Sequence, residues 1–175
     1  ESIIEKINSA MKKYMEQGLF NEYKDCLIYV ERTLSGGRVR RGIVGAVDLE
    51  CYDFRKGAKS AIRATEGTVM SRIPPRVKIR ENAPLELPHV MLLADDPEDV
   101  IFSSVSKGKM LYDFDLMENG GHLSGWLLDG NRADSVISAV DAFAQTAEDG
   151  LVFAVGDGNQ SLATAKTCWD NIKAS

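Results

Sequence analysis

The sequence is poor in the residues that carry disulfide and metal chemistry. It has three cysteines, Cys26, Cys51 and Cys168, which are odd in number and lack the close spacing of a metal site. This usage is typical of reduced thiols, so we expect a cytoplasmic protein. The two histidines, His89 and His122, stand alone, and a metal site based on either would need carboxylate partners. Most lone histidines are structural, and His122, which follows a glycine pair, is kept as an additional candidate site residue.

Long apolar runs and a surplus of positive charge are also absent. No run approaches the roughly 20 residues that cross a bilayer, and the N-terminus has no signal-peptide core, so we expect no membrane partner. The formal net charge is −5. Duplex DNA favours a basic protein face, so we expect no DNA partner, although a local basic patch stays open.

The composition that remains is that of a globular protein. The 175 residues are 44% hydrophobic and 27% charged, which suits one sizeable domain. No internal repeat or linker divides them. The chain begins with Glu1 and a helical pattern follows at once. We therefore expect a single α+β domain over residues 1–175 that is an internal fragment of a longer protein.

Apolar periodicity and turn residues predict the elements of this domain. Helices are expected at 3–15, at 75–83 after two prolines, from an acidic cap at 95–99 to about 105, at 133–144 and from about 159. Two hairpins are expected, 26–34 with 38–49 and 111–116 with 122–128, together with strands at 89–94 and 151–155. Residues 50–73 are expected to be mostly loop. The fold class is α+β, with a mixed β-sheet, hairpins and flanking helices.

The most informative stretch is the junction between the last strand and the last helix, Gly156-Asp157-Gly158-Asn159-Gln160-Ser161. A glycine turn that opens a helix leaves backbone N–H groups free at the positive end of the helix dipole, which suits phosphate. Ser161 adds a hydroxyl. In the alternative interpretation, Asp157 or Asn159 only caps the helix. The turn is not a P-loop, because no Gly-Lys-Ser/Thr ends it. Asp157 repels a bare phosphate unless it holds a cation, so a nucleotide with Mg²⁺, ATP or ADP, fits better.

Two other segments are candidates. The loop Arg63-Ala64-Thr65-Glu66-Gly67-Thr68 could supply Glu66 as a general base, with Arg63 balancing negative charge. Its alternative is a solvated loop with a surface ion pair. The basic residues Arg72, Arg76 and Arg80 share one face at four-residue spacing and could meet a nucleotide's phosphates. Their alternative is a solvated helix face.

The segments 40–47, 63–68, 80–84 and 156–161 resemble, in this order, a large bacterial family, domain of unknown function one-zero-one-five. That family in turn resembles the ParB/sulfiredoxin-like fold, whose glycine loop opens a helix and holds nucleotide phosphates. Within that group a free-serine kinase has a similar Asp-Gly-His-His-Arg loop and a catalytic glutamate after a histidine. The resemblance implies that Asp157 and Gly158 begin the phosphate loop and that Glu66 is the counterpart of the glutamate.

The departures from that pattern bear on catalysis. Gln160 stands where many relatives have histidine, Ser161 where they have a basic residue, and Thr65 where others have histidine before the glutamate. Sulfiredoxin chemistry is excluded, because Asn159 stands where cysteine is needed. From the phosphate loop and the glutamate that the resemblance implies, we expect a nucleotide- or phosphate-binding domain that transfers phosphoryl groups to the hydroxyl of a small metabolite. The alternative is a non-catalytic module in which nucleotide or another anion controls assembly with the remaining segments of the full-length chain.

In the first hypothesis, phosphates are held by the 156–161 turn with Arg63, Thr65 and Arg80. Glu66 deprotonates the acceptor and Asp157 holds Mg²⁺ or a ribose hydroxyl. The expected partners are a small-molecule ligand or nucleotide and the rest of the chain.

Overall fold

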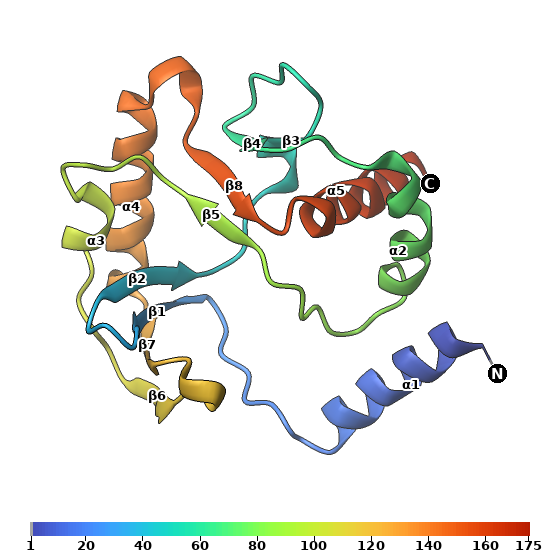
Figure 1. Cartoon of the computed structure of the whole chain (residues 1–175), viewed down its shortest axis with the longest axis horizontal. Helices are drawn as coiled ribbons and strands as arrows, with labels where there is room; N and C mark the ends of the chain where they lie inside the picture. The colour runs from blue at the N-terminus through green and yellow to red at the C-terminus, as the bar shows by residue number, and fades with distance from the viewer. Residues whose placement is uncertain (1) are drawn as a thin grey trace. The chain divides into compact units, whose positions relative to one another are not determined.

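The structure is a computed structural model that describes residues 2–175, and its elements are labelled in Figure 1. The described residues form five α-helices and two four-stranded sheets, which confirms the α+β class. They divide into two compact units. Unit 1 contains residues 2–22, Asp48–Asp95 and Ala147–Ser175, and unit 2 contains Tyr23–Val47 and Asp96–Thr146. That residues 1–175 act as one domain stays a prediction.

Unit 1 begins with α1 (Ile3–Glu16), as its apolar spacing predicts. Ser2 and Glu5 form a capping box: the Ser2 hydroxyl accepts a hydrogen bond from the Glu5 N–H at 3.2 Å, and the Glu5 carboxylate accepts one from the Ser2 N–H at 2.7 Å. Gly18, at φ +62°, follows the helix as the predicted stop.

The sheet of unit 1 has the order β3-β4-β8-β5, with β3 (Tyr52–Asp53), β4 (Ile62–Ala64), β8 (Phe153–Asp157) and β5 (Met91–Leu93). β3, β4 and β8 are parallel, whereas β5 is antiparallel to β8, so this sheet is mixed as predicted. The prediction that residues 50–73 are mostly loop was wrong for β3 and β4. Strands of two and three residues are too short to show an alternating pattern.

Two helices of unit 1 follow its strands. α2 (Ile73–Arg80) has prolines in its first turn and starts two residues before the predicted range. α5 (Asn159–Ala174) follows β8 directly. The buried core joins the sheet to α5 through Tyr52, Ile62, Val155, Leu162 and Ala165. Short 3₁₀ helices at Leu49–Cys51, Met70–Arg72 and Glu148–Gly150 complete the unit.

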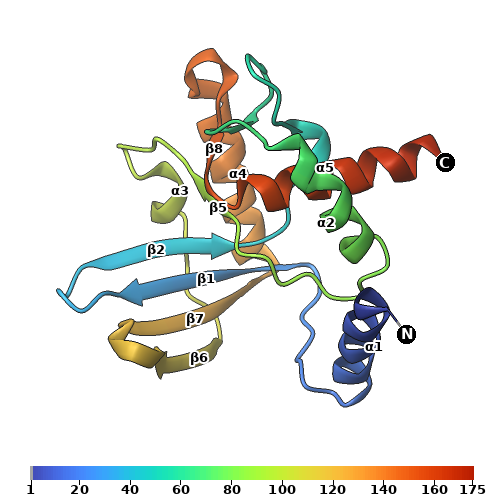
Figure 2. The same ribbon diagram turned by 45° about the vertical axis from the view of Figure 1, so that its right-hand side comes forward.

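The sheet of unit 2 is wholly antiparallel, with the order β2-β1-β7-β6 (Figure 2). Its strands are β1 (Cys26–Thr33), β2 (Val39–Val44), β6 (Met110–Asp115) and β7 (His122–Asp129). Both predicted hairpins are confirmed, β1 with β2 and β6 with β7. A 3₁₀ helix at Met117–Asn119 lies in the second turn.

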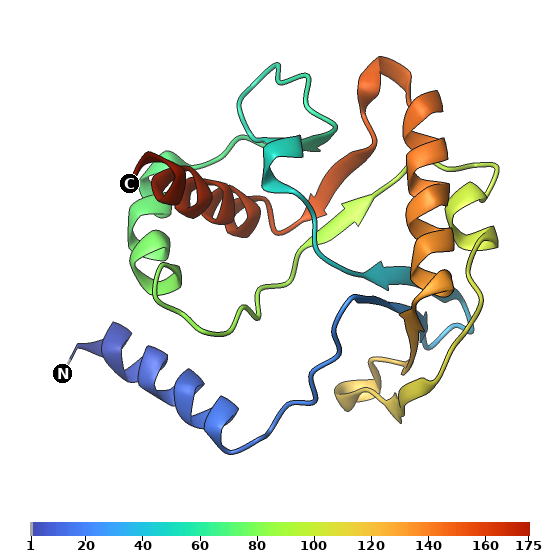
Figure 3. The same cartoon turned by 180° about the vertical axis from the view of Figure 1, so that it is seen from behind.

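Two helices cover one face of this sheet. These helices are α3 (Val100–Ser103) and α4 (Asn131–Thr146), seen from behind in Figure 3. They pack with a core of Tyr29, Leu128 and Val136. α3 is shorter than predicted, although an acidic cap is present: the Asp96 carboxylate accepts from the N–H groups of the first two helical residues at 2.9 Å each. Among residues 2–175, no helix has the length and apolar character that a membrane crossing requires.

Candidate functional site

The parallel pairing of β4 with β8 brings two of the predicted segments together. Ala64 lies opposite Val155 in the register, so both chains leave the sheet at the same edge. Thr65 and Glu66 therefore begin their loop beside the 156–161 turn. In sheets of parallel strands, ligands bind at the carboxyl ends of the strands, because loops from neighbouring strands converge there.

A buried asparagine joins the two loops. Asn159 is only 4% exposed, and its side-chain oxygen accepts a hydrogen bond from the Thr65 N–H at 3.2 Å. Its Nδ2 donates to the Thr65 hydroxyl and to the Val155 carbonyl, both at 3.3 Å. Thr65 in turn donates its hydroxyl proton to the same carbonyl at 2.6 Å. Both side chains are thus used inside the protein, and they fix the start of the Glu66 loop against α5.

The first turn of α5 has no side-chain cap. The N-cap residue is Gly158, in the left-handed region at φ +85°, so neither Asp157 nor Asn159 plays the capping role of the alternative interpretation. The Gly158 N–H donates to the Asp157 carboxylate at 2.7 Å. In the part of the chain that the structure describes, the next three N–H groups, of Asn159, Gln160 and Ser161, donate to no protein acceptor.

Gln160 adds a second unsatisfied group at this turn. Its side-chain oxygen is buried and has no hydrogen-bond partner among residues 2–175. Buried polar atoms almost always have a partner, because an unpaired one costs about 1–3 kcal/mol.

Asp157 has a neighbour that sequence reasoning missed. The side chains of Asp157 and His89 are 68% and 69% exposed, and the His89 Nε2 lies 3.8 Å from an Asp157 carboxylate oxygen. The backbone of His89 also packs on the turn, because a Cβ at Gly158 would come within 2.5 Å of the His89 carbonyl oxygen. The sequence did not predict that His89 lies beside Asp157, because the pairing of β5 with β8 was not predicted.

Arg63 lies on β4 but its guanidinium is held within the protein. It forms an ion pair with Asp149 at 3.1 Å, and it donates to the carbonyl oxygens of Ser60 and Asp149 at 2.8 and 2.5 Å. Asp149 also pairs with Lys59 at 2.8 Å, and this bond, with smaller help from Arg63, holds the pKa of the Asp149 carboxyl below its usual range. Arg63 therefore fixes the turn that precedes β8, and its role as a phosphate ligand stays a prediction.

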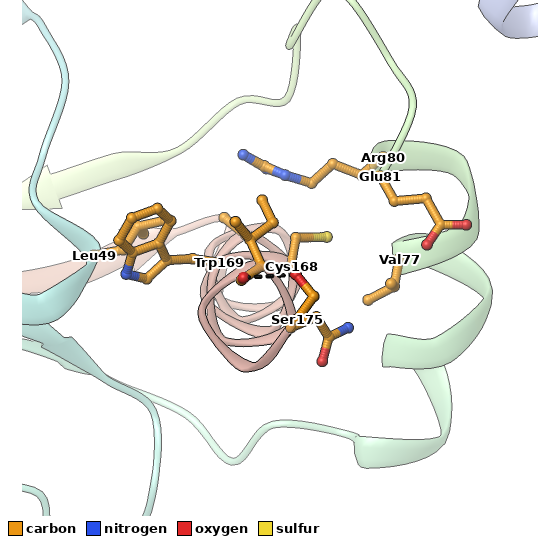
Figure 4. Close-up of a pocket in the computed structure, with 10 residues that line it drawn as sticks. Leu49, Val77, Arg80, Glu81, Cys168, Trp169 and Ser175 are labelled. Carbon is orange, nitrogen blue, oxygen red and sulfur yellow. Dashed lines mark hydrogen bonds between the residues drawn. The ribbon is translucent and has the colours of Figure 1, made fainter.

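Arg80 lies beside a different part of α5. It forms an ion pair with Glu86 and lines a pocket of about 380 Å³ together with Cys168 and Trp169 (Figure 4). Cys168 is nine residues after Asn159, or about 13 Å along the helix axis. The structure thus places Arg80 away from the first turn of α5. Burial raises the pKa of the Cys168 thiol, which makes this thiol a poor nucleophile.

His122 belongs to unit 2 and has its own acidic partners. Its Nδ1 lies 2.7 Å from Asp115 and its Nε2 lies 2.8 Å from Asp113, which also accepts from the Ser124 hydroxyl at 2.5 Å. The bond to Asp115, followed by that to Asp113, raises the pKa of His122. Both ring nitrogens lie within hydrogen-bond distance of a carboxylate, so the imidazole is held between two acidic partners of unit 2.

The residues around the turn do not form a resident metal centre. Within residues 2–175, no group of three or more histidine, cysteine, aspartate or glutamate side chains is placed to hold a metal ion. The single carboxylate of Asp157 is instead compatible with a metal ion that binds together with a nucleotide. Mg²⁺ that arrives with a nucleotide is commonly held by one or two carboxylates and the substrate's phosphates.

Comparison with known families places the chain. A family model described as Protein of unknown function (DUF1015) matches residues 1–175, so the chain belongs to this family. Neither the curated proteins nor the solved structures give a match to it.

Proposed function

We propose that unit 1 binds the phosphates of a nucleotide at the first turn of α5. The observation that carries this proposal is the convergence of three free N–H groups, from Asn159, Gln160 and Ser161, at the carboxyl end of β8. These groups lie at the positive end of the helix dipole, where an anion is stabilised. Gly158 at the N-cap lets the turn adopt a φ of +85° and lets the His89 backbone pack against it, which fixes the start of the helix.

The side chains around the turn fit a nucleotide better than a bare anion. Asp157 is exposed and could hold Mg²⁺ with the phosphates. The glycine turn between a strand and a helix also supports a ParB/sulfiredoxin-like fold for unit 1. That fold assignment is part of the proposal.

We further propose that the bound nucleotide donates a phosphoryl group to the hydroxyl of a small metabolite. The bond between the terminal phosphorus of ATP and its bridging oxygen breaks, and a bond from the acceptor oxygen to phosphorus forms. The acceptor's proton goes to the Glu66 carboxylate, and ADP leaves. Glu66 is exposed and follows Thr65, whose backbone is fixed to α5 by Asn159, so the glutamate starts from an anchored position.

One observation favours the alternative, a non-catalytic nucleotide-binding module. Phosphoryl transfer needs positive charge beside the transferred group. The arginines expected to supply it are neutralised by their own carboxylates, Arg63 by Asp149 and Arg80 by Glu86. Gln160 and Ser161 add no charge. In the module, the same turn binds the nucleotide and no transfer follows.

A thermal-shift titration tests the binding proposal. We expect Mg²⁺ with ATP or ADP to raise the melting temperature of the full chain, because a ligand that binds only the folded state stabilises it by about 2.7 kcal/mol at 100 times its Kd. For a chain of this size each kcal/mol corresponds to about 2–4 °C. An unchanged melting temperature with both nucleotides at millimolar concentration contradicts the proposal.

Glu66→Gln separates the enzyme from the module. If transfer occurs, this variant keeps the nucleotide-induced shift and loses turnover, measured as ADP release with a panel of hydroxylated metabolites. Glu148→Gln is the matched control, because Glu148 is an exposed carboxylate near the opposite end of β8. Nucleotide binding without turnover in the wild-type chain leaves only the module.

A further inference from the structure

Within the described residues of unit 2, α3 and α4 cover one face of the sheet, and neither helix lies on the other face. Tyr29 and Trp126 are directly paired across β1 and β7 and point to the covered face, where they pack with α3 and α4. Side chains alternate along a strand, so the next residues, Val30 and Gly125, point to the other face. We call this second surface the open face.

Two rows of directly paired residues cross the open face. One row runs Phe114, Leu123, Arg32, Arg40 from β6 to β2. The adjacent row contains Tyr112, whose ring lies over Gly125: a Cβ at that glycine would come within 2.3 Å of the ring. Phe114 is 47% exposed, and its ring centroid is 5.9 Å from that of Tyr112. The open face therefore has an aromatic pair on β6 and arginines on the opposite side.

The charge on the open face is positive although the chain is acidic overall. Arg40 lies directly opposite Arg32, and like charges in this position destabilise a sheet unless an anion lies nearby. Arg32 also donates to the Gly120 carbonyl at 2.9 Å, which holds its guanidinium at the sheet. Among the strand carboxylates, Glu31 and Asp113 point to the covered face, where they are engaged by Lys107 and His122. Asp129, the last residue of β7, has the register of the open face and pairs with Arg132 at 3.7 Å.

We propose that the open face binds single-stranded nucleic acid. Exposed bases stack on aromatic side chains of a sheet, while arginine binds the phosphates between them. Phe114 and Arg40 are three strands apart, or about 14 Å, which matches a segment of two or three nucleotides across the sheet. A purely apolar protein partner would bury both arginines without an acceptor, and a short acidic peptide has no use for the aromatic pair.

This inference is independent of the nucleotide site proposed in unit 1. The expectation that the chain does not bind DNA concerned duplex DNA and was based on the negative net charge. The present proposal concerns single strands and a local basic surface. Stacking on exposed aromatic rings requires unpaired bases, so a duplex is excluded from the open face.

Fluorescence anisotropy with a labelled RNA of about 10 nucleotides and mixed sequence tests the proposal on the full chain. We expect binding that weakens with salt, because phosphate contacts release counterions. Phe114→Ala should weaken it about 10-fold or more, and Arg40→Glu should weaken it and reduce its salt dependence. Phe20→Ala and Arg76→Glu are the matched controls, because both residues are exposed and lie in unit 1, Phe20 with 51% of its surface exposed.

Several results would overturn the proposal that the open face binds single-stranded nucleic acid. No binding at micromolar to millimolar protein overturns the proposal, and so does equal binding by the four variants. Equal affinity for a duplex of the same sequence, or for a poly-glutamate peptide, shows a non-specific anion surface and also overturns it. Circular dichroism spectra that match the wild-type spectrum would show that each variant is folded.

Discussion

The two sheets satisfy their polar groups in different ways. On the covered face of unit 2 the charged side chains are paired with one another. Arg41 pairs with Asp99 at 2.7 Å and Lys107 with Glu31 at 2.9 Å, and His122 lies between Asp113 and Asp115. At the carboxyl edge of the unit 1 sheet, Asn159 and Thr65 satisfy each other, yet the first N–H groups of α5 and the Gln160 oxygen do not find partners among the described residues. The covered face of the antiparallel sheet therefore pairs its own charges, whereas the parallel edge that leads into a helix leaves donors for a ligand.

The largest change in stability is expected from a substitution of Gly158, the glycine of the turn before α5. Gly158→Ala adds a Cβ at φ +85° and within 2.5 Å of the His89 carbonyl oxygen. Gly57 has a similar φ of +81° but nothing within 4 Å of its Cβ position, so Gly57→Ala isolates the cost of the backbone conformation.

We expect Gly57→Ala to lower the free energy of unfolding by about 1 kcal/mol and Gly158→Ala by about 3 kcal/mol or more. Denaturant unfolding of both variants checks this. Equal losses would show that the segment before β5, which contains His89, does not pack on the turn as described. Loss of nucleotide binding in Gly158→Ala alone would extend the result to the site.

A smaller loss is expected from the asparagine between the two loops. Asn159→Ala leaves the Thr65 N–H without its buried acceptor, so we expect the free energy of unfolding to fall by about 2–3 kcal/mol. Asn171→Ala, in the exposed last turns of the same helix, should change it by less than about 0.5 kcal/mol. Urea denaturation measures both, and two equal small changes would refute the role of Asn159 as a buried joint.

The smallest effect concerns His122 in unit 2. The folded-state pKa of His122 is raised, so its stabilising contribution is present below the ordinary histidine pKa of about 6.5 and is lost as the pH rises through the raised value. NMR titration of its ring should show a pKa above 6.5. Asp115→Asn should lower that pKa, because it removes the partner with the larger effect. A titration that is the same in both proteins contradicts the paired network.

Sequence reasoning recovered the parts of the fold that depend on local pattern. The apolar spacing of α1, the glycine turns of both hairpins and the two prolines in α2 each act over a few residues, and these elements are present. It missed β3 and β4, because their two or three residues become strands only by pairing with β8. The parallel edge was therefore outside what a local pattern can predict.

The candidate site shows the same division. The glycine turn was recognisable from residues 156–158, and the structure places the Thr65–Glu66 loop beside it. Arg63 and Arg80 share the basic character expected of phosphate ligands, but their acidic partners, Asp149 and Glu86, become visible only in the folded chain. His89 lies beside the turn because β5, which follows it, pairs with β8, and no sequence pattern predicted this pairing.

The proposed nucleotide site depends on whether the free N–H groups at the start of α5 receive a phosphate group. Titration of the ¹⁵N-labelled chain with ADP and Mg²⁺, and separately with inorganic phosphate, tests it at single residues. The account predicts that the largest amide shift changes fall on Asn159, Gln160 and Ser161. Amides at these positions that do not respond to millimolar ligand, or responses confined to other parts of the chain, would contradict it.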